Sequence, residues 1–491
     1  MLLLVLALAG RPAVFPDTDD YLIHGRNTAM TVLQALRLKR PPDPPTDQEE
    51  IDDARYAAQE MHLGIAARTP WYGLPMWALQ KLGTLWLVAA AQAAVGAWLV
   101  WLLWRTLAPG AAGWTAYAVQ AATAAASPLP FFAGFAMPDV FAGFIVAAAG
   151  LLLAAWDRLG RGERALLAGL VGYGVTVHGS HPLLAAAMLA AGALGLVLHP
   201  RAERGRLARR GMVVAGAVIA GVAASSLSMA AVKWTTGDDA GRPPFLSVRL
   251  LADGPGRGYL RWACAHGRSY VLCRDRGLPL DDTEEMLWSD QKTLGVYETV
   301  ELDVRRRLQR EDLPFAVGTL AYDPGGVAAA ALRSWAVQLA KAWVDVPLRD
   351  PHYYLTNDYW KDTNLPRLVE AMGSCGPDHH GCRPRMTAEA SKWLHGGALV
   401  LALGGIGWAL AAGATDAGLL ALLLWGMTAN ALICGALSGP FARYQARVAW
   451  VVIAAGAAVA LGRMGRSPHP PHASGAGPLP LPAERGEGSP G

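Results

Sequence analysis

Long apolar runs constrain the fold of this chain more than any other feature of its sequence. Each of them meets or approaches the roughly 20 residues that a helix needs to span a bilayer. The hydrophobic fraction of 53% and the charged fraction of 17% are also unusual for a soluble domain. Among these runs are Leu85–Trp104, Val140–Trp156, Met212–Val232 and Gly396–Ala412. The sequence therefore predicts an all-α polytopic membrane protein.

Hydropathy divides the chain into about ten transmembrane spans and one large loop. The expected spans lie near 1–15, 76–105, 112–128, 138–156, 164–178, 182–198, 211–233, 394–414, 417–437 and 446–462. We expect four regions: a transmembrane module at 1–234, a loop domain at 235–392, C-terminal membrane helices at 393–463 and a tail at 464–491. The tail is rich in Pro and Gly, which predicts disorder.

Arginine-rich loops predict the orientation of the helices. Asp157–Arg164 holds three arginines and Pro200–Gly211 holds five. Under the ten-span count both loops lie on one side of the membrane, together with Arg105 and Arg463. The positive-inside rule makes that side cytoplasmic, so we expect both termini inside and the loop at 235–392 outside. The net charge of +4 says little about nucleic acid, because the arginines lie in short loops.

The first apolar run is short for a transmembrane helix. As a helix, Met1–Phe15 would rise only about 22 Å, against about 30 Å of hydrocarbon. No basic residue precedes its apolar core, which argues against a signal peptide. We expect either a true start upstream or a helix held short by its neighbours.

Four of the five cysteines lie in the large loop, as two close pairs, Cys264 with Cys273 and Cys375 with Cys382. The fifth, Cys434, lies in an apolar span. Cysteines on the oxidising side of a membrane typically form disulfides, and this agrees with the orientation from charge. Free thiols or a zinc site are less favoured, because the loop contains no tight CxxC pair.

An acidic stretch, FPDTDDYLIHGR at 15–26, follows the first run. Its three carboxylates, Asp17, Asp19 and Asp20, lie where a hydrophobic helix would leave the bilayer. A carboxylate cluster at that depth can meet both a lipid headgroup and an aqueous substrate. An acidic start of the next helix explains the same residues equally well. Helices are expected at 27–39 and 48–63, followed by re-entry into the membrane at RTPWYG.

Three further outer turns carry reactive side chains. Ser127–Asp139 ends with an acid at the mouth of the fourth span, and His178–Pro182 holds two histidines and a serine. A lone histidine there would more often be a packed interface residue. The candidate residues of the outer face are Asp17, Asp19, Asp20, Arg68, Tyr72, Asp139, His178, His181, Arg443, Tyr444 and Arg447. Ionisable groups are few near the middle of the spans, with Lys81 closest, whereas a transporter is expected to place charges there.

The last outer turn holds Arg443 and Arg447, against the positive-inside rule. The two arginines are four residues apart, so a helix starting after Pro440 would place both on one face. The positive end of that helix would also point outward. Two guanidiniums beside a helix N-terminus predict a phosphate site. The alternative is that they reach out to lipid headgroups.

Within the large loop the sequence predicts an irregular start over Pro243–Arg276 and a charged surface helix over Glu298–Glu311. A third segment, Gly326–Trp343, places apolar residues on one helical face. That face could lie on the membrane surface or pack inside the loop domain.

These features together resemble the GT-C superfamily of polytopic glycosyltransferases. The resemblance lies in the short first span, the acidic first outer loop with two juxtamembrane helices, and the RTPWYG re-entry. The phrase Asp52-Asp53-Ala-Arg-Tyr-Ala is also similar to the acidic-Arg-Tyr-Ala phrase of lipid A aminoarabinose transferases. The superfamily also includes the protein O-mannosyltransferases. The resemblance covers residues 1–235. Two acidic clusters in this region, at 17–20 and 52–53, are both candidates for the general base.

The resemblance implies transfer of a hexose or pentose from a polyprenyl-phosphate donor to a glycan, lipid or protein of the cell envelope. It implies an inverting displacement, with a first-loop carboxylate as general base. Asp17 is the first candidate because it lies nearest the membrane, then Asp19 and Asp20, with Asp52 or Asp53 in reserve. Arginines or a divalent cation would stabilise the leaving phosphate. The resemblance places the enzyme in the bacterial inner membrane, with its site facing the periplasm.

The site residues then take two roles. Asp139 would be a second acid or a metal ligand. Arg68, Tyr72, His178, His181, Arg443, Tyr444 and Arg447 would bind substrate. An alternative is an enzyme like the O-antigen ligases or polymerases, which rely on arginine and histidine without metal. A lipid or solute transporter, or a scaffold, is the non-enzymatic alternative.

We predict the disulfides Cys264–Cys273 and Cys375–Cys382, because loops this short favour local pairing. Peptide mapping without reduction should recover both linked peptides. Free thiols at all four positions would also overturn the predicted orientation.

Overall fold

The structure, a computed structural model, describes most of the chain. The described residues are 1–3, 16–38, 69–82, 85–236, 242–274, 280–289, 295–297, 300–344, 388–413 and 416–464. Every regular element within these ranges is a helix and none is a strand, so the predicted all-α class is confirmed for the described residues. Most of the predicted first span, the helix predicted at 48–63 and the tail from 465 lie outside the described residues.

Six described helices are long and apolar enough to cross a membrane, which indicates a multi-pass membrane protein. They are α5 (Leu85–Leu107), α10 (His181–Leu198), α11 (Arg201–Thr236), α19 (Ala388–Ala411), α20 (Ala417–Leu437) and α21 (Ala442–Met464). Four shorter helices complete the bundle: α6 (Trp114–Ala126), α7 (Leu129–Gly134), α8 (Val140–Ala154) and α9 (Arg161–Thr176). The expected count of ten spans stays a prediction. The span expected at 76–105 is divided, because α4 (Pro70–Lys81) ends before α5 begins.

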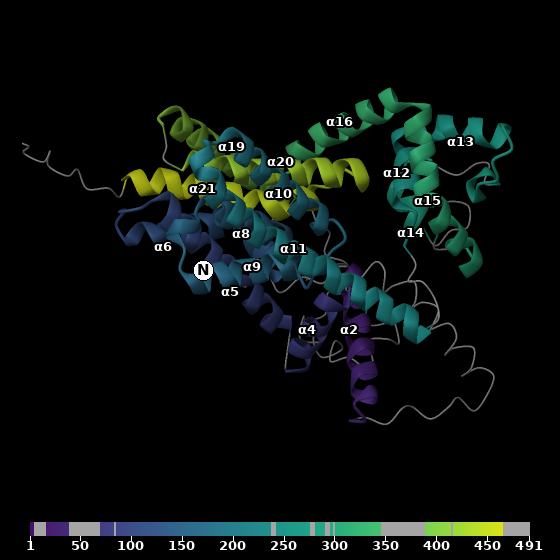
Figure 1. Ribbon diagram of the computed structural model, residues 1–491, viewed down its shortest axis with the longest axis horizontal. Coiled ribbons are helices and arrows are strands. Elements are labelled where there is room, and N and C mark those ends of the chain that lie inside the picture. The colour runs from purple at the N-terminus through teal and green to yellow at the C-terminus, as the bar shows by residue number, and fades with distance from the viewer. Residues whose placement is uncertain are drawn as a thin grey trace, which may run out of the picture.

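Helices α8 and α21 form the centre of the bundle (Figure 1). Every residue of α8 from Val140 to Leu153 is buried, as expected for a helix that is apolar on all sides. The two helices approach closely at Gly143, where an added Cβ would collide with Trp450 and with the carbonyl of Arg447. A glycine is therefore required where α8 crosses α21.

The predicted basic loops meet at one end of the bundle, which we call the basic end. Arg105 pairs with Glu163 at 2.7 Å, and Arg210 pairs with Asp157 at 2.6 Å. The short helix η1 (Trp156–Arg158) supplies a third pair, between Arg158 and Asp416, which is distant in the sequence. These pairs lie at the surface, where each contributes little stability. The pairs nevertheless show which loops lie next to one another. The starts of α8, α10 and α21 consequently lie at the opposite end.

The large loop forms a second core of its own. Its helices are α12 (Phe245–Asp253), α13 (Pro255–Ala265), η2 (Val271–Cys273), α14 (Thr283–Trp288) and α15 (Leu302–Tyr322). Figure 1 shows α12 to α15 gathered beside the bundle. Asp312 fastens α15 to the start of α12, because its carboxylate accepts 2.7 Å hydrogen bonds from both Ser247 N and Ser247 Oγ. Burial raises the pKa of Asp312.

Three expectations for this loop are decided by the structure. The irregular start predicted over Pro243–Arg276 is wrong, because α12 and α13 occupy most of it. The predicted pair Cys264–Cys273 is a disulfide, with Cα atoms 5.7 Å apart, whereas Cys375 and Cys382 lie outside the described residues. The predicted surface helix is present as α15, although it runs on to Tyr322.

Helix α16 (Pro324–Ala340) joins the loop core to the bundle. It packs along α20 and buries Ser334 and Gln338 there. At its far end, Gln338 Nε2 donates to Phe441 O at 2.8 Å and Lys341 Nζ donates to Pro440 O at 2.6 Å. Helix α16 therefore packs against the bundle and holds the turn before α21.

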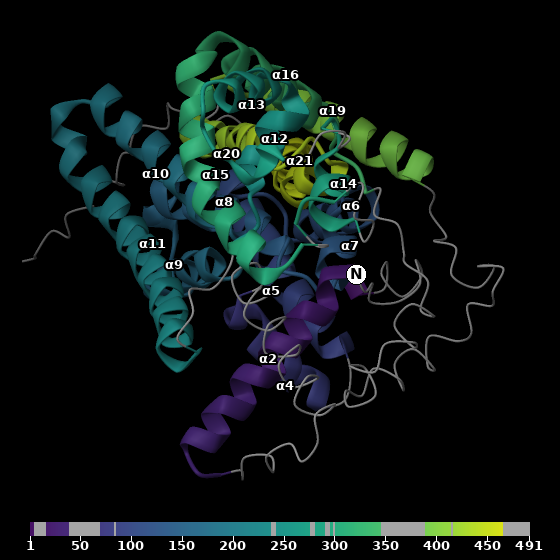
Figure 2. The same ribbon diagram turned by 90° about the vertical axis from the view of Figure 1, so that its right-hand side faces the viewer.

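The first described helix of the polar segment, α2 (Pro16–Ala35), crosses α4 at a glycine pair (Figure 2). An added Cβ at Gly25 would collide with the carbonyl of Gly73, and one at Gly73 would collide with the carbonyl of Tyr21. The helix begins earlier than the predicted 27–39, so the acidic stretch forms its first turn.

We predict that Gly25→Ala separates α2 from α4. Overpacking of this kind costs about 1–3 kcal/mol, so the unfolding temperature of the detergent-purified protein should fall by several degrees. Gly169→Ala is the matched control: this glycine is exposed on α9 and an added Cβ would meet nothing within 4 Å, and alanine favours a helix. Equal unfolding temperatures for the two variants would contradict the glycine crossing.

Candidate functional site

Asp139 and Arg447 form an ion pair inside the bundle, near the end opposite the basic end. Nη1 of Arg447 lies 3.1 Å from Oδ1 of Asp139, and the two side chains are 0% and 2% exposed. Asp139 directly precedes α8, and Arg447 lies in the second turn of α21. Burying an ion costs several kcal/mol, so charges at this depth persist only when paired and hydrogen-bonded. An ionisable pair inside a membrane bundle marks a candidate functional site.

The second terminal nitrogen of Arg447 contacts the turn before α10 and helix α20. Nη2 lies 3.0 Å from Ser180 Oγ, 3.3 Å from Asn430 Oδ1 and 3.1 Å from Cys434 Sγ. One guanidinium thus connects the start of α8, the turn before α10, and α20. Asn430 is itself oriented by α21, since its amide donates to Tyr444 O at 2.6 Å. The pair is therefore held from several sides.

The two histidines lie beside this pair. His178 Nδ1 lies 3.0 Å from Ser180 Oγ, and the rings of His178 and His181 are 5.0 Å apart. His181 is fully buried, with Nδ1 2.7 Å from Gly174 O, whereas His178 is half-buried. The packing role expected of a lone histidine describes His181 well. His178 is the histidine that a ligand can reach.

Arg443 and Arg447 share an aromatic neighbour but differ in exposure. Their guanidinium carbons lie 5.0 and 5.1 Å from the centroid of the Tyr444 ring. Arg443 also donates to the Tyr444 hydroxyl at 3.2 Å and is half-buried. Arg447 has no exposed surface, so its side chain does not extend to lipid headgroups. Of the two, Arg443 is the one that can contact a ligand from solution.

The acidic residues at 17–20 lie in the first turn of α2. Thr18 Oγ1 donates to Ala136 O at 3.2 Å, which brings this turn to within three residues of Asp139 along the chain. Asp20 is half-buried, and the side chains of Asp17 and Asp19 lie outside the described part of the structure. Acids at a helix N-terminus are stabilised by the helix dipole, as the alternative reading of this stretch expected.

Tyr72 lies between α2 and α8. Its hydroxyl donates to Gln92 Oε1 at 3.0 Å, and its ring packs edge-on against Tyr21 and Phe141, with centroids 5.2 and 6.3 Å away. Gln92 in turn donates at 2.9 Å to two carbonyls, one in the last turn of α7 and one just after it, in the segment that leads to α8. Tyr72 thus helps to support the turn that carries Asp139. Arg68, Asp52 and Asp53 lie outside the described residues.

The structure therefore brings residues from four predicted outer turns to one end of the bundle. Sequence reasoning missed Asn430 and Cys434 as partners of Arg447, although a polar side chain in an apolar span is a recognisable signal. It noted the serine at 180 only as part of its turn. Among the described residues no group of three or more His, Cys, Asp or Glu side chains is placed to hold a metal ion.

Comparison of the chain with protein-family models, with curated proteins and with solved structures finds no match.

We predict a strong energetic coupling between Asp139 and Arg447. Asp139→Asn and Arg447→Gln should each lose about 3–5 kcal/mol of stability, because each leaves a buried charge without its partner. The double variant should lose less than the sum of the two. Denaturant-induced unfolding of the purified protein, monitored by intrinsic fluorescence, measures the stability lost in the two single variants and in the double variant.

The control is the exposed pair of Arg306 and Asp303, whose closest atoms are 3.8 Å apart. Arg306→Gln should leave stability within experimental error, as is typical of surface pairs. Strictly additive losses at Asp139 and Arg447 would show that the pair does not interact.

Proposed function

We propose that this protein is a membrane glycosyltransferase of the GT-C type. It moves a sugar from a polyprenyl-phosphate donor to a glycan, lipid or protein acceptor of the cell envelope, working in the bacterial inner membrane with its site facing the periplasm. The observation that carries the proposal is the proximity of opposite charges at one end of the bundle. The acidic first turn of α2 contacts Ala136, close to Asp139, and Asp139 pairs with Arg447 beside His178 and Arg443.

The proposed reaction is an inverting displacement. A carboxylate of Asp17, Asp19 or Asp20 accepts the proton of the acceptor hydroxyl as its oxygen attacks the anomeric carbon. The bond between that carbon and the phosphate oxygen breaks with its electron pair, and polyprenyl phosphate leaves. Cations aimed at the leaving phosphate stabilise the charge that develops on it. A donor held in a lipid bilayer suits a site at the membrane surface.

The burial of the cationic residues suggests a division of roles among them. Arg443 and His178 are half-buried and suit direct contact with the phosphate. Arg447, fully buried and bonded to four partners, suits a positioning role that fixes the turns around it. A divalent cation would share the charge of the leaving phosphate, with the carboxylates of the α2 turn as its candidate ligands. Asp139 is engaged by Arg447.

The test is turnover of a polyprenyl-phosphate-linked sugar by the purified protein. Asp17→Asn and Asp20→Asn remove a candidate base while conserving shape, and at least one should abolish transfer. Arg443→Lys keeps the charge but loses the planar fork, and should slow turnover on the order of tenfold or more, about 1.4 kcal/mol of transition-state stabilisation. Arg37→Lys, in the exposed turn after α2, is the control and should turn over at the wild-type rate.

The possible outcomes separate the alternatives. Full activity in both aspartate variants would make the base assignment wrong. Loss in Arg443→Lys alone would favour the ligase-like mechanism, which depends on arginine and histidine. If no sugar is transferred to any envelope fraction by the wild-type protein, the enzymatic proposal fails.

A further inference from the structure

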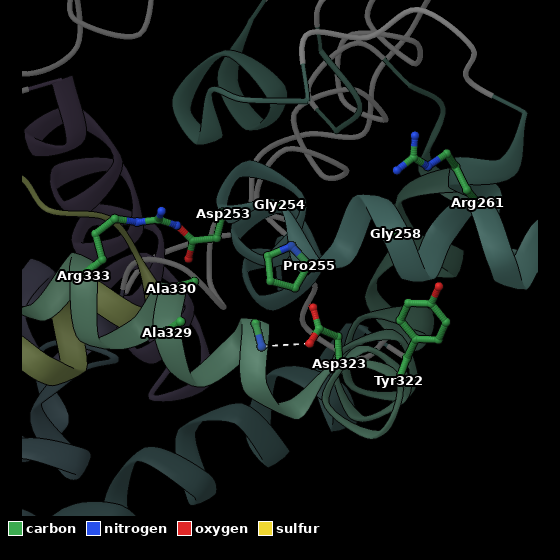
Figure 3. A pocket seen from close by; sticks show the side chains of 11 residues that line it. Asp253, Gly254, Pro255, Gly258, Arg261, Tyr322, Asp323, Ala329, Ala330 and Arg333 are labelled. Carbon is green, nitrogen blue, oxygen red and sulfur yellow. Dashed lines mark hydrogen bonds between the residues drawn. The ribbon is translucent and has the colours of Figure 1, made fainter.

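A cleft of about 360 Å³ opens where the loop core meets α16. Figure 3 shows its lining, which comes from the junction of α12 with α13 and from the junction of α15 with α16. Arg261 and Tyr322 lie at one end of the cleft, Arg333 and Asp253 lie at the other, and Asp323 lies between them. The volume falls within the range of pockets that hold small ligands. None of these residues belongs to the site around Asp139.

The lining of the cleft holds two aspartates and two arginines, and both aspartates are already engaged. Asp253 pairs with Arg249 at 2.8 Å, and burial raises its pKa while the guanidiniums of Arg249 and Arg333 lower it. The ion-pair partner of Asp253 is thus the buried Arg249, which does not line the cleft. Asp323 is engaged in capping α16, since its carboxylate accepts a 2.8 Å hydrogen bond from Gly326 N.

Two arginines of the cleft are available to a ligand. Within the described residues, Arg261 and Arg333 have neither a hydrogen bond nor an ion pair through their side chains, and both are exposed. Unpaired guanidiniums in a concave surface favour carboxylate or phosphate groups, which they bind bidentately. Because both aspartates of the lining are engaged by other groups, these two arginines favour an anionic ligand.

Exposed aromatic rings adjoin the same cleft. Tyr322 is 49% exposed and Trp262 is 42% exposed, and their ring centroids lie 5.7 Å apart. His266 stacks on Trp262 at 4.6 Å, and Tyr259 supports both exposed rings from the core, with centroids 6.0 and 5.9 Å away. A rigid aromatic surface offers its face to the C–H groups of a sugar ring, while neighbouring polar groups bond the hydroxyls.

We propose that this cleft binds an acidic glycan, a saccharide that carries carboxylate or phosphate groups. The sugar ring stacks on Tyr322, and the acid groups lie against Arg261 and Arg333. Helix α16 runs from the cleft to the turn before α21, with about 18 Å of helical rise between Gly326 and Gln338. An acceptor chain of several sugars could span that distance. Its role as acceptor rests on the proposed function, whereas the binding itself does not.

The experiment applies the full-length protein in lipid nanodiscs to an array of neutral, carboxylated and phosphorylated oligosaccharides. We expect retention on acidic glycans, reduced at least tenfold by Arg261→Gln and by Tyr322→Ala. Arg310→Gln is the matched control, because Arg310 is an exposed arginine of α15 about 18 Å of helical rise from Tyr322. This control should keep wild-type retention.

Several results would overturn the proposal. One is equal retention of the wild-type protein on neutral and acidic glycans, and another is an equal loss of retention in Arg310→Gln. A third is a wild-type protein that is retained on no glycan but binds phosphatidylglycerol vesicles, with that binding lost in Arg261→Gln and Tyr322→Ala. The last result would identify a lipid-headgroup site. Sugar transfer is measured separately, so glycan retention without donor turnover would refute the proposed function and leave this inference standing.

Discussion

The ion pair of Asp139 and Arg447 is the interaction on which one end of the bundle depends. Because neither charge meets water, each needs the other, and the Nη2 atom of Arg447 needs Ser180 and Asn430. The bonds of its two terminal nitrogens thus fix the turns before α8 and α10 against α20 and α21. The close crossing at Gly143 brings the two central helices near enough for the pair to form.

The accessible chemistry lies around this rigid pair. Arg443 and His178 remain half-buried beside it, and the acidic turn of α2 contacts the segment that leads into α8. The large loop is tied to the same end, because α16 packs on α20 and bonds the turn before α21. A ligand in the cleft of the loop core and a ligand at the bundle end would therefore contact opposite ends of one helix.

Much of the helical framework could be predicted from the sequence. Apolar runs of membrane-spanning length located α5, α10, α11, α19, α20 and α21, because hydrocarbon requires the backbone to satisfy its own hydrogen bonds. Cysteine spacing predicted the pair Cys264–Cys273. Element boundaries were less predictable. The acidic stretch proved to be the first turn of α2, and the glycine-rich start of the large loop proved to be helical.

The sequence by itself determined the class of protein and the residue types available at each turn, because hydropathy and charge act locally along the chain. Only the tertiary structure decided which of those residues meet. Arg443 and Arg447 look equivalent at a spacing of four, yet one is half-buried while the other is enclosed with Asp139. Asn430 and Cys434 become partners of Arg447 only through the packing of α20 against α21. Burial depends on contacts between helices distant in the chain, and no local pattern encodes it.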